Sequence, residues 1–570
     1  MNASSPVGPH GLDRFAARIR AALADALGVE AGTIQLERPR QEQLGDFALP
    51  CFRFAKERGG NPAALAARLA GELAVAEVEP AAAGPFLNFR VDRPALAAAV
   101  LADAERPDFG GGGDGGTTLV EYSSPNIAKP MHVGHLRSTV IGAALARIFA
   151  HLGHRVVRIN HLGDWGSQFG KLVAAWRRWG SEPAIEADPI GHLLELYVRY
   201  HREEEADPGL ADEAKAAFRE LESGEDNDTR RIWRRFTTLS LREFDKVYRR
   251  LGSDFDFVRG ESWYEDQLGP LLDWLAERGV LEESDGATII DLSAQGIKTP
   301  MLVRTAHGTT LYATRDLAAA LSRWREFAFD RCLYVVGQEQ KLHFAQLVAA
   351  LERAGCDWAR RIEHVPFGLI RMAEGRLSTR AGRVLALREL LDRAVELAAE
   401  VIAEKNPDLP DRAAAAEQIG VGAVIFHDLK HQRTKDVVFD WDKVLSFEGD
   451  TGPYLQYTHA RCCAILRKAG RPAPATSEID PGLLADSPEL LVALGRFPQA
   501  VREAADRREP MMLAQHLLKL GAAINAFYRD RRVLGEEPAL EDARLAAVDR
   551  ARRVLALGLG LLGVPAPEEM

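Results

Sequence analysis

Cysteine is scarce in this sequence, and the few cysteines follow no disulfide or metal-binding pattern. The 570 residues include five, and none of them forms a C-x-x-C pair. Neither a disulfide framework nor a zinc ribbon is indicated. Hydrophobic residues make up 46% and charged residues 27% of the chain, which is typical of globular domains and argues against wholesale disorder.

Long hydrophobic runs are missing as well. The longest, from Val554 to Pro567, is shorter than the ~20 residues of a membrane span and is interrupted by three glycines. The first thirty residues contain Arg14, Arg18 and Arg20 but no apolar stretch typical of a secretory signal. We therefore expect a cytoplasmic protein with reduced thiols and no membrane partner.

Charge is unevenly distributed along the chain. The net charge is −10, but residues 181–228 alone hold 15 acidic and 4 basic residues, a local charge of −11. The next segment, 229–250, has 8 basic and 2 acidic residues. A polyanion can bind a basic face while the acidic segment stays in solvent, so the net charge does not exclude a nucleic-acid partner.

The length predicts two to four domains at ~150 residues each. Residues 1–109 combine helical periodicity at 12–27 and 63–74 with an alternating strand pattern at 86–91, which predicts a small α+β domain. The glycine-rich segment that follows, 110–116, is predicted to be a flexible linker.

The central region, 117–386, contains two strand–helix–strand patterns. The first has strands at 117–122 and 155–160 around a helix that starts near Leu136, and the second lies at 333–367. A helical insertion at about 181–260 separates them. Such crossovers favour a parallel sheet, so we expect a split, Rossmann-like doubly wound domain.

From residue 387 onward the pattern is almost wholly helical, most clearly at 501–528 and 545–562. We divide this part into a helical region at 387–455 and an all-α C-terminal domain at 456–570. The expected fold class is therefore multidomain α/β, with an α+β domain before the doubly wound sheet and helices after it.

The strongest local motif lies between the first strand and its helix and is Lys129-Pro130-Met131-His132-Val133-Gly134-His135. Doubly wound sheets bind ligands at the carboxyl ends of their strands, where a helix N-terminus favours phosphate. Two imidazoles there can donate hydrogen bonds to a phosphoryl group, and Gly134 lets a flat base approach the backbone. Capping or core histidines are the alternative that the motif alone leaves open.

This motif resembles the HIGH box of class I aminoacyl-tRNA synthetases, and the longer segment from Glu121 to Thr139 resembles its version in the arginyl-tRNA synthetases. Five further segments match that family in its order: 160–166 (NHLGDWG), 311–317 (LYATRDL), 440–442 (DWD), 452–457 (GPYLQY) and 561–565 (LLGVP). The resemblance spans essentially the whole chain.

The resemblance implies an arginine–tRNA ligase. ATP, accompanied by Mg2+, would activate L-arginine to arginyl-adenylate, and the arginyl group would pass to the 3′ end of tRNA(Arg). No tightly bound protein metal is expected, and the family pattern is a monomer that needs bound tRNA for activation. The N-terminal domain would contact the D-loop of the tRNA, residues 387–455 its stem, and residues 456–570 its anticodon.

The matched motifs also imply site residues. The residues implied for ATP binding are Lys129, His132, Gly134 and His135. By resemblance, Lys129 and the two histidines are also catalytic. Those for arginine are Glu121, Asn126, Tyr312, Asp316 and Gln340. Of the latter, Glu121, Tyr312 and Asp316 would bind the guanidinium, a planar cation best held by carboxylates, while Asn126 and Gln340 would hold the α-amino and carboxylate end. Without the resemblance, a helix N-cap is the alternative interpretation of Asp316.

A second class I signature, KMSKS, is altered in this chain. Segment 375–382 stands in its place, with Arg376 at the first lysine position and Thr379 at the second. The resemblance implies that Lys129 compensates for the missing lysine, and that Arg376, Ser378 and Arg380 form a catalytic phosphate clamp. A solvated basic loop is the alternative.

Four residues are implied as tRNA contacts: Phe86, Asn88, Gln456 and Tyr457. An exposed aromatic ring can stack on an unpaired base, and an amide can pair with the edge of a base. The family often has asparagine where this chain has Ala83, and a buried Phe86 is the alternative reading of this segment.

Three other functions stay open on the sequence alone. A class I synthetase for another amino acid would lack the carboxylates at Glu121 and Asp316. A small-molecule nucleotidylyltransferase would not need the two terminal domains. A catalytically inactive relative that binds RNA is favoured by the altered KMSKS segment and opposed by the intact Lys129, His132 and His135.

Overall fold

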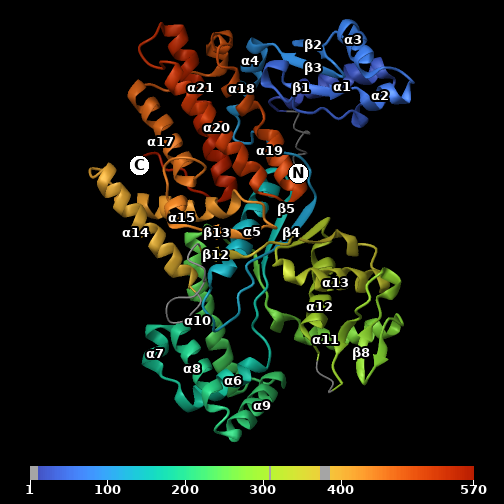
Figure 1. The fold of residues 1–570 in the computed structure, drawn as a ribbon. Coiled ribbons are helices and arrows are strands. Elements are labelled where there is room, and N and C mark those ends of the chain that lie inside the picture. The colour runs from blue at the N-terminus through green and yellow to red at the C-terminus, as the bar shows by residue number, and fades with distance from the viewer. Residues whose placement is uncertain (1–9, 307–309, 373–384) are drawn as a thin grey trace.

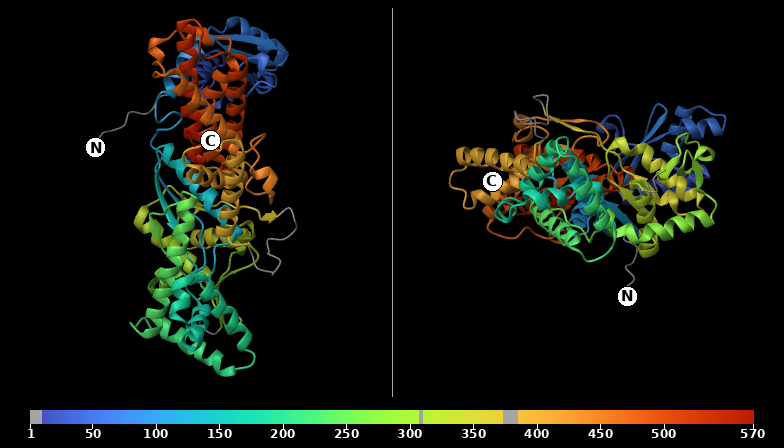
Figure 2. Two further views of the ribbon diagram at one scale, coloured as in Figure 1. Left: turned by 90° about the vertical axis from the view of Figure 1, so that its left-hand side faces the viewer. Right: turned by 90° about the horizontal axis from the view of Figure 1, so that it is seen from below.

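The computed structural model describes residues 10–306, 310–372 and 385–570. The molecule is elongated, with the C-terminal helices and the N-terminal domain at one end, the parallel sheet in the middle and the helical insertion at the other end (Figures 1 and 2). No helix within these ranges is long and apolar enough to cross a membrane.

The N-terminal domain is an antiparallel sheet of order β1-β3-β2 with helices packed against it. Its elements are α1 (Asp13–Leu27), β1 (Phe47–Pro50), α2 (Phe52–Glu57), α3 (Pro62–Glu72), β2 (Val78–Ala83), β3 (Phe86–Val91) and α4 (Arg93–Ala104). The predicted strand at 86–91 is confirmed as the central strand, with Leu87, Phe89 and Val91 buried. Asn61 caps α3 by accepting a hydrogen bond from the backbone N–H of Ala63.

The glycine-rich segment 110–116 has no helix or strand and packs against the C-terminal end of α5 (Val133–His151). The N–H of Gly112 donates to the carbonyl of His151 at 2.9 Å. A Cβ on Gly111 would lie 2.4 Å from that same carbonyl oxygen. The glycines therefore allow the chain to pass close against the end of a helix. The flexibility expected for this segment stays a prediction.

The central sheet is parallel, with order β11-β10-β4-β5-β6. Its elements are β4 (Thr117–Glu121), α5 (Val133–His151), β5 (Arg155–Asn160), β6 (Phe257–Val258), α12 (Tyr312–Phe327), β10 (Arg331–Tyr334), α13 (Lys341–Arg353) and β11 (Ile362–His364). Both predicted crossovers are present, β4-α5-β5 and β10-α13-β11. Helix α5 packs into a core shared with the C-terminal helices, whereas α12 and α13 pack into a second core.

The helical insertion lies beyond the sheet and consists of α6 (Ser167–Trp179), α7 (Glu182–Ala187), α8 (Pro189–Glu203), α9 (Pro208–Glu222) and α10 (Asp228–Arg250). Helix α6 packs on α8 and α9, so the helical layer also includes residues before 181. Acidic residues of this segment pair with arginines of the layer itself, as in Arg178–Asp207 at 2.6 Å and Arg234–Asp226 at 2.8 Å. Part of the acidic charge is therefore neutralised locally.

Smaller elements complete the central region, some of them before α12 in the chain and the others between β11 and the C-terminal domain. They are α11 (Glu265–Glu277), the antiparallel strands β7 (Glu282–Ser284), β8 (Ala287–Ile290) and β9 (Met301–Arg304), the parallel pair β12 (Ile370–Met372) and β13 (Val437–Phe439), and the helices α14 (Leu387–Lys405), α15 (Arg412–Leu429) and α16 (Trp441–Val444). Helices α14 and α15 pack closely against each other.

The C-terminal domain contains α17 (Gly452–Ala469), α18 (Pro488–Gly495), α19 (Phe497–Arg507), α20 (Met511–Asp530) and α21 (Pro538–Leu562). The single helical stretch expected at 501–528 is wrong, because α19 ends at Arg507 and α20 begins at Met511. Arg508 has a left-handed backbone, with φ of 53°, and Pro510 lacks the N–H that a continuous helix would need.

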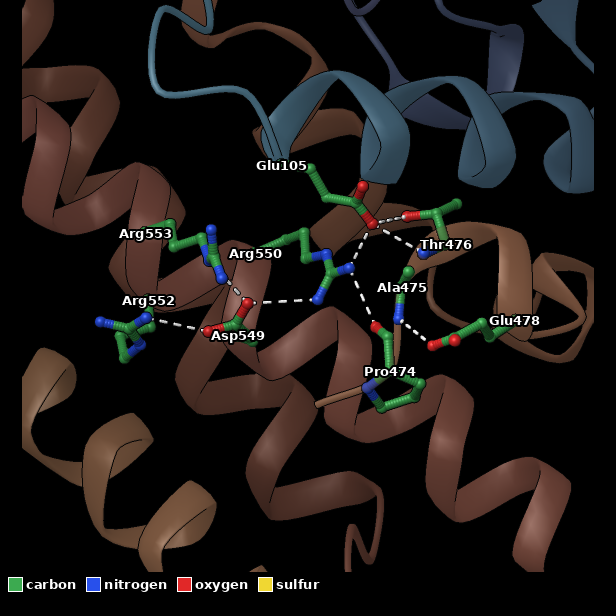
Figure 3. A network of polar contacts seen from close by, with 9 residues as sticks. All are labelled: Glu105, Pro474, Ala475, Thr476, Glu478, Asp549, Arg550, Arg552 and Arg553. Atoms are coloured by element: carbon green, nitrogen blue, oxygen red, sulfur yellow. Dashed lines mark hydrogen bonds and ion pairs between the residues drawn. The ribbon is translucent and has the colours of Figure 1, made fainter. Parts of the chain in front are cut away.

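A polar network joins the end of the N-terminal domain to α21 (Figure 3). Glu105, after α4, accepts hydrogen bonds from the backbone N–H of Thr476 at 2.6 Å and from the guanidinium of the buried Arg550. Burial opposes its charge, but the bonds from Thr476 and Arg550 hold the pKa of Glu105 below its ordinary value. The buried carboxylate of Asp549 accepts from three arginines, Arg550, Arg552 and Arg553.

Replacing Asp549 with asparagine is expected to cost about 3 kcal/mol of stability, because the buried Arg550 loses a charged partner that water cannot replace. Differential scanning calorimetry should show a lower transition midpoint for Asp549→Asn. Asp530→Asn is the matched control, since Asp530 is exposed and pairs with the exposed Arg529, and it should leave the midpoint unchanged. Equal midpoints for both variants would contradict the role of the network.

Candidate active site

The site lies where the order of the central sheet reverses, between β4 and β10. The chain continues from β4 to β5 on one side and from β10 to β11 on the other. Glu121, at the end of β4, is paired in register with Tyr334, at the end of β10. The carboxyl ends of strands at such a switch point form the crevice in which these sheets bind ligands.

The two motif histidines begin α5 at this crevice. His132 is the N-cap residue, and its Nδ1 accepts a hydrogen bond from the N–H of Gly134 at 3.1 Å. The Nδ1 of His135 accepts from the N–H of His132 at 3.1 Å. Because each Nδ1 accepts, each ring carries its proton on Nε2 and is neutral. Burial lowers the pKa of both rings, that of His135 to about 4, which keeps them neutral near pH 7.

The capping interpretation of the histidines is confirmed, because both rings cap the helix through Nδ1. Each ring keeps its Nε2–H as a donor, and phosphate binding by the pair stays a prediction. Gly134 is required between them for a steric reason. A Cβ at that position would lie 2.7 Å from Cε1 of His132 and would displace the ring. The exposed Gly134 backbone thus adds a flat surface beside two hydrogen-bond donors.

Lys129 is exposed on the loop before α5. Its Nζ is 5.2 Å from the centre of the Tyr197 ring, which α8 of the insertion contributes. A cation over an aromatic face at this distance is attracted by the ring. The insertion therefore contacts the one lysine of the motif, a contact that the sequence did not indicate.

Glu121 has a partner within the protein that the sequence did not predict. Its Oε2 lies 2.5 Å from Nη1 of Arg323, a residue of α12 that has no exposed side-chain surface. Burial disfavours the charge of Arg323, but Glu121 keeps the pKa of that guanidinium well above its ordinary value. The carboxylate predicted for a substrate guanidinium thus already holds an internal one, so Glu121 and Asp316 are not two equivalent substrate carboxylates.

Asp316 and Tyr312 lie at the start of α12. The helix begins at Tyr312, which is 57% exposed, so Asp316 is on its second turn and the N-cap interpretation of Asp316 is wrong. Nε2 of His343 lies 2.6 Å from Oδ2 of Asp316, and the His343 ring is 5.0 Å from that of Tyr312. Gln340, half-buried, immediately precedes α13, which carries His343.

Asn126 is exposed on the loop after β4 and forms an isolated parallel bridge with Gly163. A Cβ on Gly163 would lie 2.1 Å from Oδ1 of Asn126, so this glycine leaves room for the Asn126 side chain. The two matched segments around residues 126 and 163 thus meet in space.

Further acidic side chains lie around Glu261, close to Arg315 and Asp316. Glu265 Oε1 accepts from Nε of Arg315 at 2.6 Å, and Asp164 accepts from the hydroxyl of Ser262 at 2.6 Å. Burial raises the pKa of Glu261 to about 7; Arg315 opposes this rise, whereas Asp316 and Asp164 add to it. Within the described part of the chain, no group of three or more histidine, cysteine or acidic side chains is arranged to hold a metal ion.

Sequence reasoning missed several of these residues. Asp164 and Arg315 lie inside matched segments, which is a signal that would have found them. Arg323, His343 and Glu261 carry no comparable local signal, because their partners are distant in the sequence.

Three family models match the chain: "tRNA synthetases class I (R), catalytic domain" at 110–441, "DALR anticodon binding domain" at 455–570 and "Arginyl tRNA synthetase N terminal domain" at 13–91. A curated arginine–tRNA ligase of Enterococcus faecalis is 46% identical over 558 residues, which are 96% of this chain and 98% of the relative. The chain belongs to the arginyl-tRNA synthetase family.

Other arginyl-tRNA synthetases agree with this assignment. The arginine–tRNA ligase of Clostridioides difficile is 43% identical and covers 94% of this chain and 95% of its own length. The solved arginyl-tRNA synthetase of Thermus thermophilus is 31% identical, with a TM-score of 0.81 over 97% of this chain and 99% of that one. That of Plasmodium falciparum, at 22% identity and a TM-score of 0.82 over 99% and 100%, shares the fold.

The chain is thus a class I aminoacyl-tRNA synthetase, a ligase, rather than a small-molecule nucleotidylyltransferase or a synthetase for another amino acid. The expected fold class is confirmed in all three parts. The predicted phosphate clamp of the arginyl-tRNA synthetase, Arg376, Ser378 and Arg380, lies outside the described residues.

The predicted tRNA contacts of this synthetase differ in exposure. Asn88 is 3% exposed in the centre of the N-terminal sheet, and its side chain offers almost no surface to a base. Phe86 is half-buried at the start of β3, edge-on to the exposed Phe52. Of the two predicted residues, Phe86 is therefore the more accessible to RNA.

Gln456 is fully buried, and the prediction that it contacts tRNA is wrong. Its Nε2 donates to the carbonyls of Gln418 and Pro565, both at 2.9 Å, and so ties α17 to α15 and to the chain after α21. The neighbouring Tyr457 is exposed and lies 4.7 Å from the guanidinium of Arg461. Tyr457 lines a cavity of about 700 Å³ together with Lys405, Phe447, Tyr454, Arg461 and Met570.

Proposed function

We propose that this synthetase activates L-arginine with ATP at the crevice between β4 and β10 and transfers the arginyl group to the 3′ end of tRNA(Arg). The observation that carries the proposal is the pair of neutral imidazoles at the start of α5, each with Nδ1 occupied by a backbone N–H. Both present an Nε2–H donor at a helix N-terminus, which suits developing negative charge on a phosphate.

In the first step, a carboxylate oxygen of arginine attacks the α-phosphorus of ATP, and the bond to the bridging oxygen of pyrophosphate breaks. The products are arginyl-adenylate and pyrophosphate. His132 and His135 stabilise the phosphate through Nε2–H, and Lys129 supplies a positive charge for the leaving pyrophosphate. The Gly134 backbone supports the adenine. Mg2+ bound to the phosphates of the substrate ATP would supply positive charge beside that of Lys129.

In the arginine pocket, Asp316 accepts hydrogen bonds from the substrate guanidinium, and the exposed ring of Tyr312 lies beside it. Asn126 and Gln340 hold the α-amino and carboxylate end. Glu121 lies behind this pocket, with one oxygen engaged by Arg323. The second step is attack of the terminal ribose hydroxyl of the tRNA on the activated carbonyl, which gives the ester and AMP.

In tRNA binding, Phe86 contacts the D-loop. An anticodon base enters the cavity lined by Tyr457 and stacks on its ring. The altered KMSKS segment, Arg376, Ser378 and Arg380, clamps the pyrophosphate. All five cysteines are free and buried, which fits a reducing compartment, so we place the enzyme in the cytoplasm. That the enzyme acts as a monomer stays a prediction.

Arginine-dependent exchange of labelled pyrophosphate into ATP tests this function, with and without total tRNA. Exchange that needs tRNA is the expected result and supports the activity, its amino acid and RNA-dependent activation together. Exchange without tRNA would support the synthetase activity but contradict the prediction that activation depends on RNA. Absence of exchange in both conditions, with tRNA still bound, would indicate a catalytically inactive relative.

A further inference from the structure

The carboxylate assigned to the substrate guanidinium has a protein partner of its own. Nε2 of His343 lies 2.6 Å from Oδ2 of Asp316, which is a short hydrogen bond to a charged acceptor. The side chains are 9% and 19% exposed, respectively, so water competes little for this contact. The proton lies on Nε2 of His343, because a carboxylate oxygen can only accept.

His343 is itself held by rings on two sides. Its ring is 5.0 Å from that of Tyr312 and 5.3 Å edge-on to that of Phe344. Phe344 in turn packs against the buried Tyr334 at the end of β10 and stacks on His364 at 4.7 Å. The orientation of the His343 imidazole is therefore fixed by the end of the sheet.

The neighbouring carboxylate cannot replace Asp316. Glu121 is engaged by the fully buried Arg323, which also packs on Tyr334 at 5.2 Å. Contacts thus run without interruption from Glu121 through Arg323, Tyr334, Phe344 and His343 to Asp316. Within this series, Asp316 is the more exposed of the two carboxylates.

We propose that His343 is a positioning residue for arginine binding, which holds Oδ2 of Asp316 and leaves Oδ1 aimed at the substrate guanidinium. The inference rests on the proposed function of Asp316. The terminal torsion of an aspartate is broad, and a guanidinium requires acceptors in its own plane, so an unheld carboxylate binds it less well. A donor that fixes the carboxylate therefore strengthens arginine binding without contacting arginine.

The test compares His343→Leu with His343→Gln in aminoacylation. Leucine fills the space without a donor, whereas the amide of glutamine can still donate to Asp316. We expect His343→Leu to raise KM for arginine about 10- to 50-fold, with KM for ATP unchanged and kcat within about 3-fold. His343→Gln should recover most of the loss.

His364→Leu is the matched control, because His364 stacks on the same Phe344 ring but bonds the carbonyl of Val336 instead of Asp316. Because Tyr334 still packs on Phe344 in this variant, KM for arginine should be unchanged. If His343→Leu does not fold, as judged by circular dichroism, His343→Asn replaces it, since the shorter amide does not reach Oδ2. An unchanged KM in the variant used, or an equal rise in His364→Leu, would overturn the proposal.

The double variant Asp316→Ala/His343→Leu separates the inference from the function on which it rests. If His343 acts through Asp316, the second substitution should add nothing to the rise in KM that Asp316→Ala causes. Additive effects would overturn the positioning role. An unchanged KM for arginine in Asp316→Ala alone would instead show that Asp316 does not bind the guanidinium, and the positioning role of His343 would then be overturned as well.

Discussion

Lys129→Ala is expected to lower kcat for pyrophosphate exchange by about 100-fold and to change KM for arginine only a few-fold. The KMSKS position holds Arg376 and Thr379, so this lysine is the ammonium group nearest the histidine motif in sequence. Its charge is needed most when pyrophosphate leaves. Loss of an interaction made mainly in the transition state reduces kcat rather than ground-state binding.

The control for Lys129 is a second lysine that makes the same kind of contact with a tyrosine ring. Lys171 also lies over a tyrosine of α8, with Nζ 5.3 Å from the Tyr200 ring, but it pairs with Glu204 and is not part of the histidine motif. Lys171→Ala should leave kcat unchanged, and Lys129→Arg should keep part of it because the charge remains. Full activity of Lys129→Ala would contradict the compensation for the altered KMSKS segment.

Asp316→Ala is expected to raise KM for arginine by about 100-fold or more and to leave KM for ATP nearly unchanged. A charge-assisted, partly buried contact with a guanidinium is lost, which costs about 3 kcal/mol, and ~1.4 kcal/mol corresponds to a factor of ten. Aminoacylation at varied arginine and at varied ATP measures both constants.

Glu326→Ala serves as the comparison for Asp316. Glu326 belongs to the same helix, α12, but lies near the C-terminal end of that helix. It pairs there with Arg259, with 2.9 Å between Oε1 of Glu326 and Nη2 of Arg259. It should leave KM for arginine unchanged. Equal rises in KM for arginine and for ATP in Asp316→Ala would show that the substitution disturbs the crevice as a whole rather than the guanidinium contact.

Local sequence was sufficient for the parts of the site that one loop supplies. His132 and His135 are three residues apart, so the turn that begins α5 brings both rings together wherever the helix packs. The same holds for the two crossovers, because hydrophobic periodicity and strand length are properties of short segments. The glycine between the histidines is also a local requirement.

Burial and pairing at long range could not be predicted in the same way. The sequence around Gln456 matches an RNA-binding family segment, yet the residue is buried because the chain after α21 returns to cover it. The buried Arg550 is likewise bound by Glu105, which is 445 residues away along the chain.

The sequence by itself determined the family, the order of the domains and the histidine motif, because each rests on short segments whose geometry follows from the local chain. The tertiary structure decided which charges remain for substrates. Glu121 is held by Arg323, and Asp316 is held by His343, because helices α12 and α13 pack against the ends of β4 and β10. An ion pair in a low-dielectric interior depends on that packing, and no local pattern encodes it.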